Sequence, residues 1–248
     1  MREIIYLKEK AKIDGGIFFG KGVFETILIK DKPIFLNEHI KRLNEAIEKL
    51  AIGEAINSNN VEQFIKENNI KNTVLKILIT EKNIIYTTRK NKYTKEDYKN
   101  GFRLKFSEVL RNPTSMLTYI KSINYLENLI EYEKAQNKGY NEAIFLNIEG
   151  NVAEGCTTNI FLVKNNKLIT PKVSSGILPG VVRQWVIDNY SCEEKYITKD
   201  ELLHADEVFL TNSVVGIIKV SSIEEIQFKD NVTEDIRKVY NNIVLGGK

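Results

Sequence analysis

The sequence predicts a mixed α+β protein with two domains and a cleft between them. Apolar, β-branched runs alternate with segments of helical period along the 248 residues. Tight turns rich in Asn and Gly separate several of these runs in the second half. Pro113 interrupts the pattern at Arg111–Ser115, so we divide the chain into an N-terminal domain over 1–112, a linker over 113–120 and a C-terminal domain over 121–248.

The first domain is expected to combine strands with two helices. Apolar residues recur at helical spacing over Glu38–Ala51, and Asn37 just before them is a suitable N-cap. A second helix is expected around Asn60–Asn68. The strand candidates are Val23–Lys30, Pro33–Leu36, Thr73–Thr80, Ile84–Arg89 and Phe102–Glu108.

The second domain is expected to begin with a helix over Tyr125–Lys138, which Gly139 ends. Another helix should start near Gly180, and Thr198 with Glu201 forms a capping box for a short one. We expect Val232–Leu245 to close the chain as a helix. The strand candidates are Glu142–Asn147, Val152–Glu154, Asn159–Val163, Leu168–Ile169, Glu207–Thr211 and Ile217–Ser221.

Composition narrows the class of protein. The 36 basic and 33 acidic residues leave a net charge of +3 and are spread along the chain, which argues against a nucleic-acid-binding protein. Two cysteines, Cys156 and Cys192, form neither a disulfide framework nor a metal motif. The start lacks the apolar run of a signal peptide, and no stretch is long enough to cross a bilayer. We expect a cytoplasmic protein that acts on a small molecule, away from membranes.

Lys121 is a candidate for forming an imine with an aldehyde. It follows Leu117–Ile120 and precedes the predicted helix that starts at Tyr125, so its side chain can reach a cleft. An imine-forming lysine must be neutral, which requires partial desolvation or a neighbouring positive charge. The alternative is an ordinary surface lysine, a common case in a chain with this many lysines.

Glu154 is a candidate partner for a pyridine nitrogen, because small residues on both sides would let a flat ring approach the backbone. A carboxylate there keeps the ring protonated, so that it works as an electron sink. The alternative is a turn glutamate next to a strand. Thr157, Thr158 and Asn159 can donate hydrogen bonds to a phosphate or a substrate, although such polar runs are mostly turns.

The segment GILPGVVR, residues 176–183, offers backbone N–H groups in a turn that leads into a helix. Such a turn binds phosphate without much positive charge. Arg42, one helical turn after His39, is a possible cationic partner of a phosphate, or else a solvated arginine on a helix face. A protein that binds pyridoxal 5'-phosphate (PLP) must provide three groups. They are a lysine that forms an imine, a carboxylate for the ring nitrogen and a turn that binds the phosphate.

The segment FFGKGVFET, residues 18–26, leads into a strand on which Glu25 and Thr26 point to opposite faces. We favour Thr26 as the residue that faces the cleft, where its hydroxyl can relay a proton. The two histidines, His39 and His204, are too few for a zinc site or a Ser-His triad.

These segments, in this order, resemble the class IV aminotransferases, the fold-type IV PLP enzymes. The match runs from Gly15 to about Val220, and its most specific part is Lys121-Ser-x-Asn followed by Glu154-Gly-x-x-x-Asn159-x-Phe161. The resemblance implies the two-domain architecture of that family, with the active site in the interdomain cleft. It also implies a homodimer, by analogy alone.

By this resemblance Lys121 is the Schiff-base lysine and Glu154 meets the pyridine nitrogen. The expected contacts of the PLP phosphate are Arg42, Val181 and Val182 through their backbone N–H groups, and Ser213.

Within the family, three features favour the aminodeoxychorismate lyases, which make 4-aminobenzoate for folate. They are Thr26, the stretch Arg111-Asn112-Pro113, and the stretch 211–216, TNSVVG. Against this, the usual Gly-rich arginine loop is replaced by Thr80-Glu81-Lys82-Asn83. Arg89 or Arg111 is then expected to bind the substrate carboxylates instead.

Three alternatives stay open. A branched-chain or D-amino acid aminotransferase would use the same lysine and glutamate, and would need a keto acid for turnover. A relative without activity would bind PLP or a phosphorylated metabolite and release no product. An α+β module without a cofactor would be colourless when purified.

Overall fold

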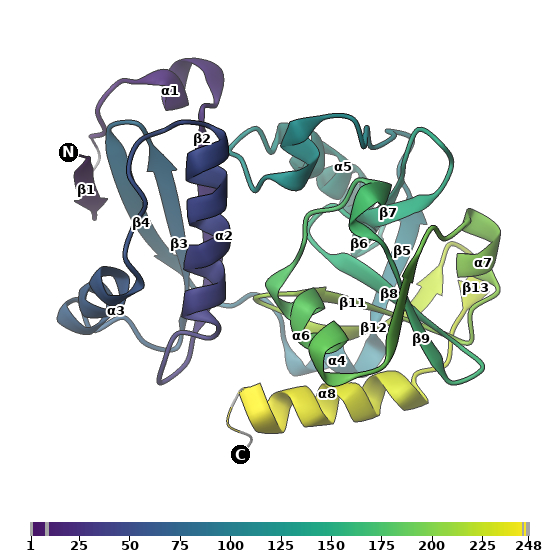
Figure 1. Cartoon of the computed structure of the whole chain (residues 1–248). Coiled ribbons are helices and arrows are strands. Elements are labelled where there is room, and N and C mark those ends of the chain that lie inside the picture. The colour runs from purple at the N-terminus through teal and green to yellow at the C-terminus, as the bar shows by residue number, and fades with distance from the viewer. Residues whose placement is uncertain (1, 8–9, 245, 247–248) are drawn as a thin grey trace. The chain divides into compact units, whose positions relative to one another are not determined.

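The computed structural model describes residues 2–7, 10–244 and 246, and the chain forms two compact units (Figure 1). Unit 1 consists of Met1–Lys92 and Ile120–Leu126, and unit 2 of Tyr93–Tyr119 and Glu127–Lys248. These limits differ from the division at 112 and 121 made from the sequence. Pro113 lies in a turn inside unit 2, whereas the segment that carries Lys121 pairs with a strand of unit 1.

Unit 1 is a four-stranded sheet in the order β1-β4-β3-β2, with β1 parallel to β4 and the other pairs antiparallel. One face of the sheet packs against α2, whose buried Ile40, Leu43 and Ile47 follow the predicted helical period. The elements are β1 (Glu3–Tyr6), α1 (Gly15–Phe19), β2 (Gly22–Ile29), α2 (Leu36–Lys49), α3 (Ser58–Glu67), β3 (Thr73–Thr80) and β4 (Asn83–Arg89).

The start of α2 corrects two expectations. Helix α2 begins at Leu36, after Phe35 in a left-handed conformation with φ of 55°, so Asn37 is inside the helix and is not its N-cap. The predicted strand Pro33–Leu36 is wrong, because only Pro33 pairs with Ile29 before the chain turns into the helix.

Unit 2 is built on a nine-stranded sheet in the order β10-β9-β8-β11-β12-β5-β6-β7, with β13 paired to β12. Helix α8 packs against β11 and β12. The strands are β5 (Phe102–Phe106), β6 (Glu142–Leu146), β7 (Val152–Gly155), β8 (Asn159–Lys164), β9 (Lys167–Pro171), β10 (Cys192–Lys195), β11 (Glu207–Asn212), β12 (Gly216–Ile223) and β13 (Ile226–Gln227). The helices are α4 (Lys95–Asn100), α5 (Leu126–Asn137), α6 (Val181–Asn189), α7 (Lys199–Leu203) and α8 (Asn231–Val244).

Most strands and helices lie within one or two residues of their expected positions. Leu245, the expected end of the last helix, lies outside the described residues. Five elements, β1, α1, α4, β10 and β13, were not expected. Helix α4 carries a capping box, in which Thr94 and Asp97 bond to each other's backbone N–H, so the sequence did contain a signal for it.

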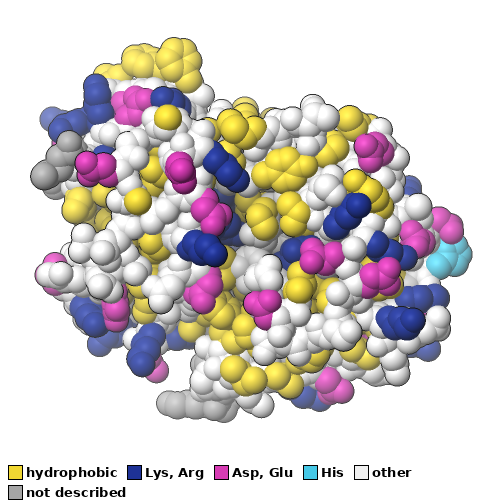
Figure 2. Space-filling view, in the orientation of Figure 1, with side chains coloured by type: hydrophobic (Ala, Val, Ile, Leu, Met, Phe, Trp, Pro, Cys, Tyr) yellow, Lys and Arg dark blue, Asp and Glu magenta, His cyan; other side chains and the backbone are white. Residues whose placement is uncertain are grey.

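The molecular surface carries basic and acidic side chains intermixed over the face in Figure 2. Hydrophobic side chains gather over α1, where Ile17, Phe18 and Phe19 are exposed (Figure 2). In the described part of the chain, no helix has both the length and the apolar character needed to span a membrane.

Candidate functional site

Lys121 lies on a segment that pairs with the edge strand β2. The backbone N–H of Phe24 donates to the carbonyl of Lys121 at 2.9 Å, and that of Ile123 donates to Gly22 at 3.0 Å. The Lys121 ammonium lies 4.6 Å from the centre of the Phe24 ring and 5.2 Å from that of Tyr125. The Lys121 amine therefore lies against two aromatic rings.

Glu25 and Thr26 point to opposite faces of β2, as expected. Glu25 is fully buried on the α2 side, where its carboxylate bonds to Arg42 at 2.7 and 2.8 Å and to His39 at 2.7 Å. Burial alone would raise the pKa of Glu25, but the charge of Arg42, and then that of His39, holds it well below its ordinary value. Arg42, the expected phosphate arginine, is thus held in one orientation by an ionised carboxylate.

Thr26 occupies the other face of the same sheet. It lies directly across from Lys76 on β3, which in turn lies across from Thr87 on β4. Arg89, an expected substrate residue, is exposed at the end of β4 and donates to the carbonyl of Lys90. Thr26 and Arg89 therefore belong to one face of the unit 1 sheet.

Glu154 lies at the end of β7 with its carboxylate buried in unit 2. One oxygen accepts from the N–H of Leu178 at 3.0 Å and from the amide of Asn159 at 3.4 Å. The other lies 3.7 Å from a guanidinium nitrogen of Arg111. One oxygen of Glu154 is thus hydrogen-bonded, and the other faces a positive charge.

Arg111, the other expected substrate residue, is a buried side chain with partners inside the protein. It donates to Glu127 at 2.9 Å, approaches Glu154, and places its guanidinium 3.8 Å from the centre of the Phe145 ring. These contacts put Arg111 behind Glu154, where its charge acts on that carboxylate.

The loop from Glu154 to Asn159 is fixed by buried polar contacts. The Thr157 hydroxyl donates to Glu142 at 2.7 Å, and the amide of Asn128 donates to the carbonyl of Cys156 at 2.7 Å. Burial raises the pKa of Glu142, and its hydrogen bonds with Thr157, Cys156 and Ala143 offset only part of that rise. In the described structure the hydroxyl oxygen of Thr158 is buried without a hydrogen-bond partner.

The turn before α6 presents backbone N–H groups without a side-chain cap. Gly180 is the N-cap residue and makes no side-chain hydrogen bond, so the first-turn N–H groups of Val181 and Val182 have no capping group. A Cβ on Gly180 would lie 1.9 Å from the amide oxygen of Asn159. Because Asn159 also bonds to Glu154, this turn and the buried carboxylate form one assembly.

Ser213 lies in the tight turn between β11 and β12 and is half-buried. The side chain of Asn212 shapes this turn by accepting from the N–H groups of Val214 and Val215, both at 2.8 Å. The expected residues thus form two groups. Unit 1 carries Lys121, Thr26, Arg42 and Arg89, and unit 2 carries Glu154, Thr158, Asn159, Val181, Val182, Ser213 and Arg111.

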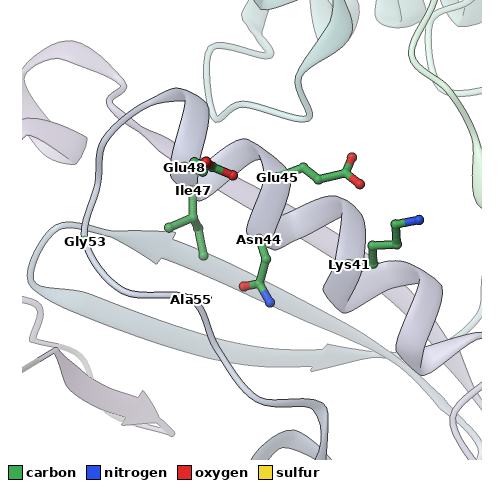
Figure 3. A pocket seen from close by; sticks show the side chains of 7 residues that line it. All are labelled: Lys41, Asn44, Glu45, Ile47, Glu48, Gly53 and Ala55. Carbon is green, nitrogen blue, oxygen red and sulfur yellow. The ribbon is translucent and has the colours of Figure 1, made fainter.

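A depression beside α2 is a separate feature of unit 1 (Figure 3). It is lined by Lys41, Glu45 and Glu48 among others, and by none of the expected site residues. Asn44 at this place exchanges two hydrogen bonds with the backbone of Ile56, so it fastens the loop that follows the helix.

Comparison with known proteins covers nearly the whole chain. The model of the family described as "Amino-transferase class IV" matches residues 22–223. This chain belongs to the class IV aminotransferase family.

Individual relatives include both lyases and transaminases of the class IV family. The chain is 30% identical to the aminodeoxychorismate lyase of Bacillus subtilis over 251 residues, covering 90% of this chain and 86% of that one. It is 32% identical to the D-alanine aminotransferase of Bacillus licheniformis over 235 residues, covering 85% and 82%. A Legionella pneumophila structure described as a candidate 4-amino-4-deoxychorismate lyase superposes with a TM-score of 0.89 at 30% identity, covering 97% and 98%.

Sequence reasoning about this class IV chain did not find Lys76, Glu142 or the contact of Arg111 with Glu154. Lys76 and Glu142 lie on strands that read only as β-structure, and no local motif marks them. The neighbours of Lys76 and Glu142 depend on the order of the strands in each sheet, which is visible only in the folded chain.

Proposed function

We propose that this protein is a PLP-dependent lyase that converts 4-amino-4-deoxychorismate to 4-aminobenzoate and pyruvate. The observation that carries the proposal is the Lys121 ammonium, held over two aromatic rings on the unit whose sheet presents Thr26. Membership of the class IV family and the similarity to the Bacillus subtilis lyase support it.

The residues present fit PLP. When bound, this cofactor supplies an aldehyde that a lysine amine can join and a pyridine ring that withdraws electrons from the reacting carbon. Glu154 is a buried carboxylate suited to the pyridine nitrogen, and the uncapped N–H groups of Val181 and Val182 suit a phosphate. Thr158 adds a buried hydroxyl without a partner in the described structure. Arg42 and Ser213 are proposed as the remaining phosphate contacts.

We assign the proton transfers to two side chains. Lys121 Nζ, once released, removes the proton from the carbon that bears the substrate amine, which requires a neutral amine. Thr26 donates a proton to the departing enolpyruvate and recovers one from the ammonium that Lys121 has become. Loss of pyruvate makes the product ring aromatic, so the protein has chiefly to bind and orient the substrate.

A transaminase for branched-chain or D-amino acids is the second candidate, because the D-alanine aminotransferase of Bacillus licheniformis is about as similar as the lyase. The two differ in their need for an acceptor. A lyase releases pyruvate continuously without a keto acid, whereas a transaminase stops after one turnover. A binding protein without activity would release nothing in either assay.

The decisive experiment uses the purified protein with aminodeoxychorismate, lactate dehydrogenase coupling and no keto acid. We expect continuous pyruvate release by the wild type and a fall of about 1000-fold or more in Lys121→Ala, because the catalytic base is lost. Borohydride reduction should fix the cofactor on the peptide that contains Lys121. Lys71→Ala, which removes an exposed lysine of the same unit, is the matched control. Label on another peptide, or no pyruvate from the wild type, would contradict the proposal.

We further propose that the enzyme acts as a homodimer in the cytoplasm and serves folate synthesis. The support is analogy with the class IV family and the product named above.

A further inference from the structure

Two separate elements of unit 2 carry its proposed phosphate contacts. The start of α6 presents the backbone N–H groups of Val181 and Val182, and the turn between β11 and β12 contains Ser213. A hydrogen bond is strong only over a narrow range of lengths and angles. One phosphate can therefore bind both elements only if the fold keeps the spacing between them fixed.

The turn between β11 and β12 has a shape of its own. Its Asn212 bonds to the N–H groups inside the turn, and the amide of the same residue donates to the carbonyl of Thr157 at 3.3 Å. The hydroxyl of Tyr98, on α4, donates to the carbonyl of Val215 at 2.8 Å. These bonds fix the turn itself, but none of them joins it to α6.

An aromatic ring is packed against the end of this turn. Gly216 there has a left-handed backbone with φ of 68°. A Cβ on Gly216 would lie 2.8 Å from a ring carbon of Tyr240, and the three atoms nearest to it all belong to that ring. Tyr240 lies on α8 and is 1% exposed. Its ring therefore touches the backbone of the turn, an approach that glycine alone permits.

The same ring also contacts α6. Its centre lies 5.0 Å from that of Trp185, and the two ring planes meet at 84°. This edge-to-face arrangement is one that aromatic pairs prefer. Trp185 follows Val181 by four residues, so about one helical turn separates this contact from the proposed phosphate donors. Tyr240 is thus a single side chain that contacts both phosphate-binding elements.

Helix α8 is fixed to the sheet independently of this contact. Glu207, at the start of β11, accepts hydrogen bonds from the N–H groups of Val232 and Thr233 at 2.9 and 2.8 Å. Thr233, Ile236 and Tyr240 are buried and follow one another at helical spacing. The helix packs along β11 and β12 (Figure 1). Tyr240 therefore stands on an anchored support.

We propose that Tyr240 is a positioning residue for the cofactor phosphate, and that its ring sets the spacing between the start of α6 and the turn that contains Ser213. This inference rests on the proposed function, in particular on the binding of PLP. Tyr240 acts through Gly216 and Trp185. Lys121 belongs to unit 1, so its reaction with an aldehyde does not depend on these contacts. Loss of the ring should therefore weaken phosphate binding selectively.

The test compares PLP with pyridoxal, which has the same aldehyde and ring but no phosphate. Each is titrated into the full-length apoprotein and followed by absorbance. We expect Tyr240→Leu to raise the Kd of PLP by about 10- to 100-fold, the loss that one hydrogen bond to a charged group represents, and to leave the Kd of pyridoxal nearly unchanged.

Two further variants are controls for this change. Tyr240→Phe keeps the ring and should bind PLP as the wild type does. Tyr190 also contacts Trp185, with ring centres 6.2 Å apart, from the other end of α6. Tyr190→Leu removes that ring and leaves the contact between Tyr240 and Gly216 in place, so we expect wild-type affinity for PLP.

Gly216→Ala tests the same contact from the side of the turn and does not depend on the folding of Tyr240→Leu. Its new Cβ would collide with the Tyr240 ring, and its backbone would be strained at a positive φ. The turn has to shift away from α8 as a result. We again expect weaker binding of PLP and little change for pyridoxal.

Three results would overturn the inference. They are a wild-type preference for PLP over pyridoxal in Tyr240→Leu, an equal loss for both compounds, and a loss in Tyr240→Phe as large as that in Tyr240→Leu. The proposed function fails separately, if the wild type binds PLP no more tightly than pyridoxal or if its holoenzyme makes no pyruvate. In the second case a selective loss in Tyr240→Leu would still support the role of Tyr240.

Discussion

Two buried glutamates of this protein are accommodated in opposite ways. Glu25 is held by the Arg42 cation and by a hydrogen bond with His39, and these contacts keep its pKa low in spite of burial. Glu142 has hydroxyl, thiol and backbone hydrogen-bond partners, and its burial raises its pKa. The first residue is thus suited to orient an arginine, and the second to hold the loop that carries Glu154 through its hydrogen bond with Thr157.

The raised pKa of Glu142 predicts how stability depends on pH. The native protein keeps a proton on Glu142 at pH values where the unfolded chain has lost it, so this group's contribution declines as pH rises above its ordinary value of 4.5. Glu142→Gln keeps an acceptor for Thr157 and cannot ionise. We therefore expect the free energy of unfolding of Glu142→Gln, relative to the wild type, to increase between pH 4 and pH 8.

Urea unfolding of both proteins across this range measures the difference. The contribution of Glu25 to stability has the opposite pH dependence, because it is lost as pH falls. Both proteins contain Glu25, so its contribution cancels in the comparison. A difference that is independent of pH would show that Glu142 is ionised in the native state.

At the level of single residues, sequence reasoning identifies a candidate where the residue lies in a local motif. Lys121, Glu154 and Gly180 each lie in a short segment whose neighbours indicate the chemistry. Lys76 has no such neighbours, and only its register with Thr26 and its contact with Phe24 draw attention to it. Arg111 was expected to bind substrate because the usual Gly-rich arginine loop is replaced by Thr80-Glu81-Lys82-Asn83. Burial against Glu154 was not predictable from the order of residues.

At the scale of elements, the structure depends on close contact between the start of α6 and the strand β8. Asn159, the first residue of β8, bonds through its amide to the carbonyl of Leu178 at 2.8 Å and faces Gly180. The absence of a side chain at Gly180 lets this amide approach the backbone. This close contact holds the start of α6 in place, and with it the backbone N–H groups of Val181 and Val182.

Gly180→Ala tests this contact. The added Cβ would collide with the amide oxygen of Asn159 and displace either that side chain or the start of the helix. Such overpacking costs about 1–3 kcal/mol, and we expect weaker binding of PLP, measured by absorbance titration of the apoprotein. Gln184→Ala, on the exposed side of the same helix, is the control and should bind as the wild type does. Equal affinity in both variants would exclude a role of this contact in cofactor binding.

Elements with a strong periodic pattern were predictable, and short ones were not. Helix α2 was expected because its apolar residues recur over several turns, but its start was missed since Phe35 adopts a left-handed conformation that residues of its type rarely have. The edge strands β1 and β10 have four residues each, and neither alternates clearly in polarity. Each becomes a strand by pairing with a neighbour, β1 with β4 and β10 with β9.

At the scale of the whole molecule, the proposed homodimer is directly measurable. A chain of 28.5 kDa should elute with twice that mass when size-exclusion chromatography is combined with light scattering at micromolar concentration. The exposed apolar residues of α1 are unusual for a monomer's surface, which agrees with this expectation. A single mass of 28.5 kDa across a wide concentration range would contradict it.

The pairing of Ser122 with Val23 has a practical consequence for dissecting the protein. A fragment that stops at residue 92 would keep all four strands of the first sheet and lose the stretch that hydrogen-bonds along the outer side of β2. The unpaired N–H and C=O groups of β2 would then promote self-association of the fragment. The fragment would also lack Lys121, the amine proposed to react with an aldehyde. Anyone expressing this half alone should splice residues 120–126 onto it through a short flexible tether.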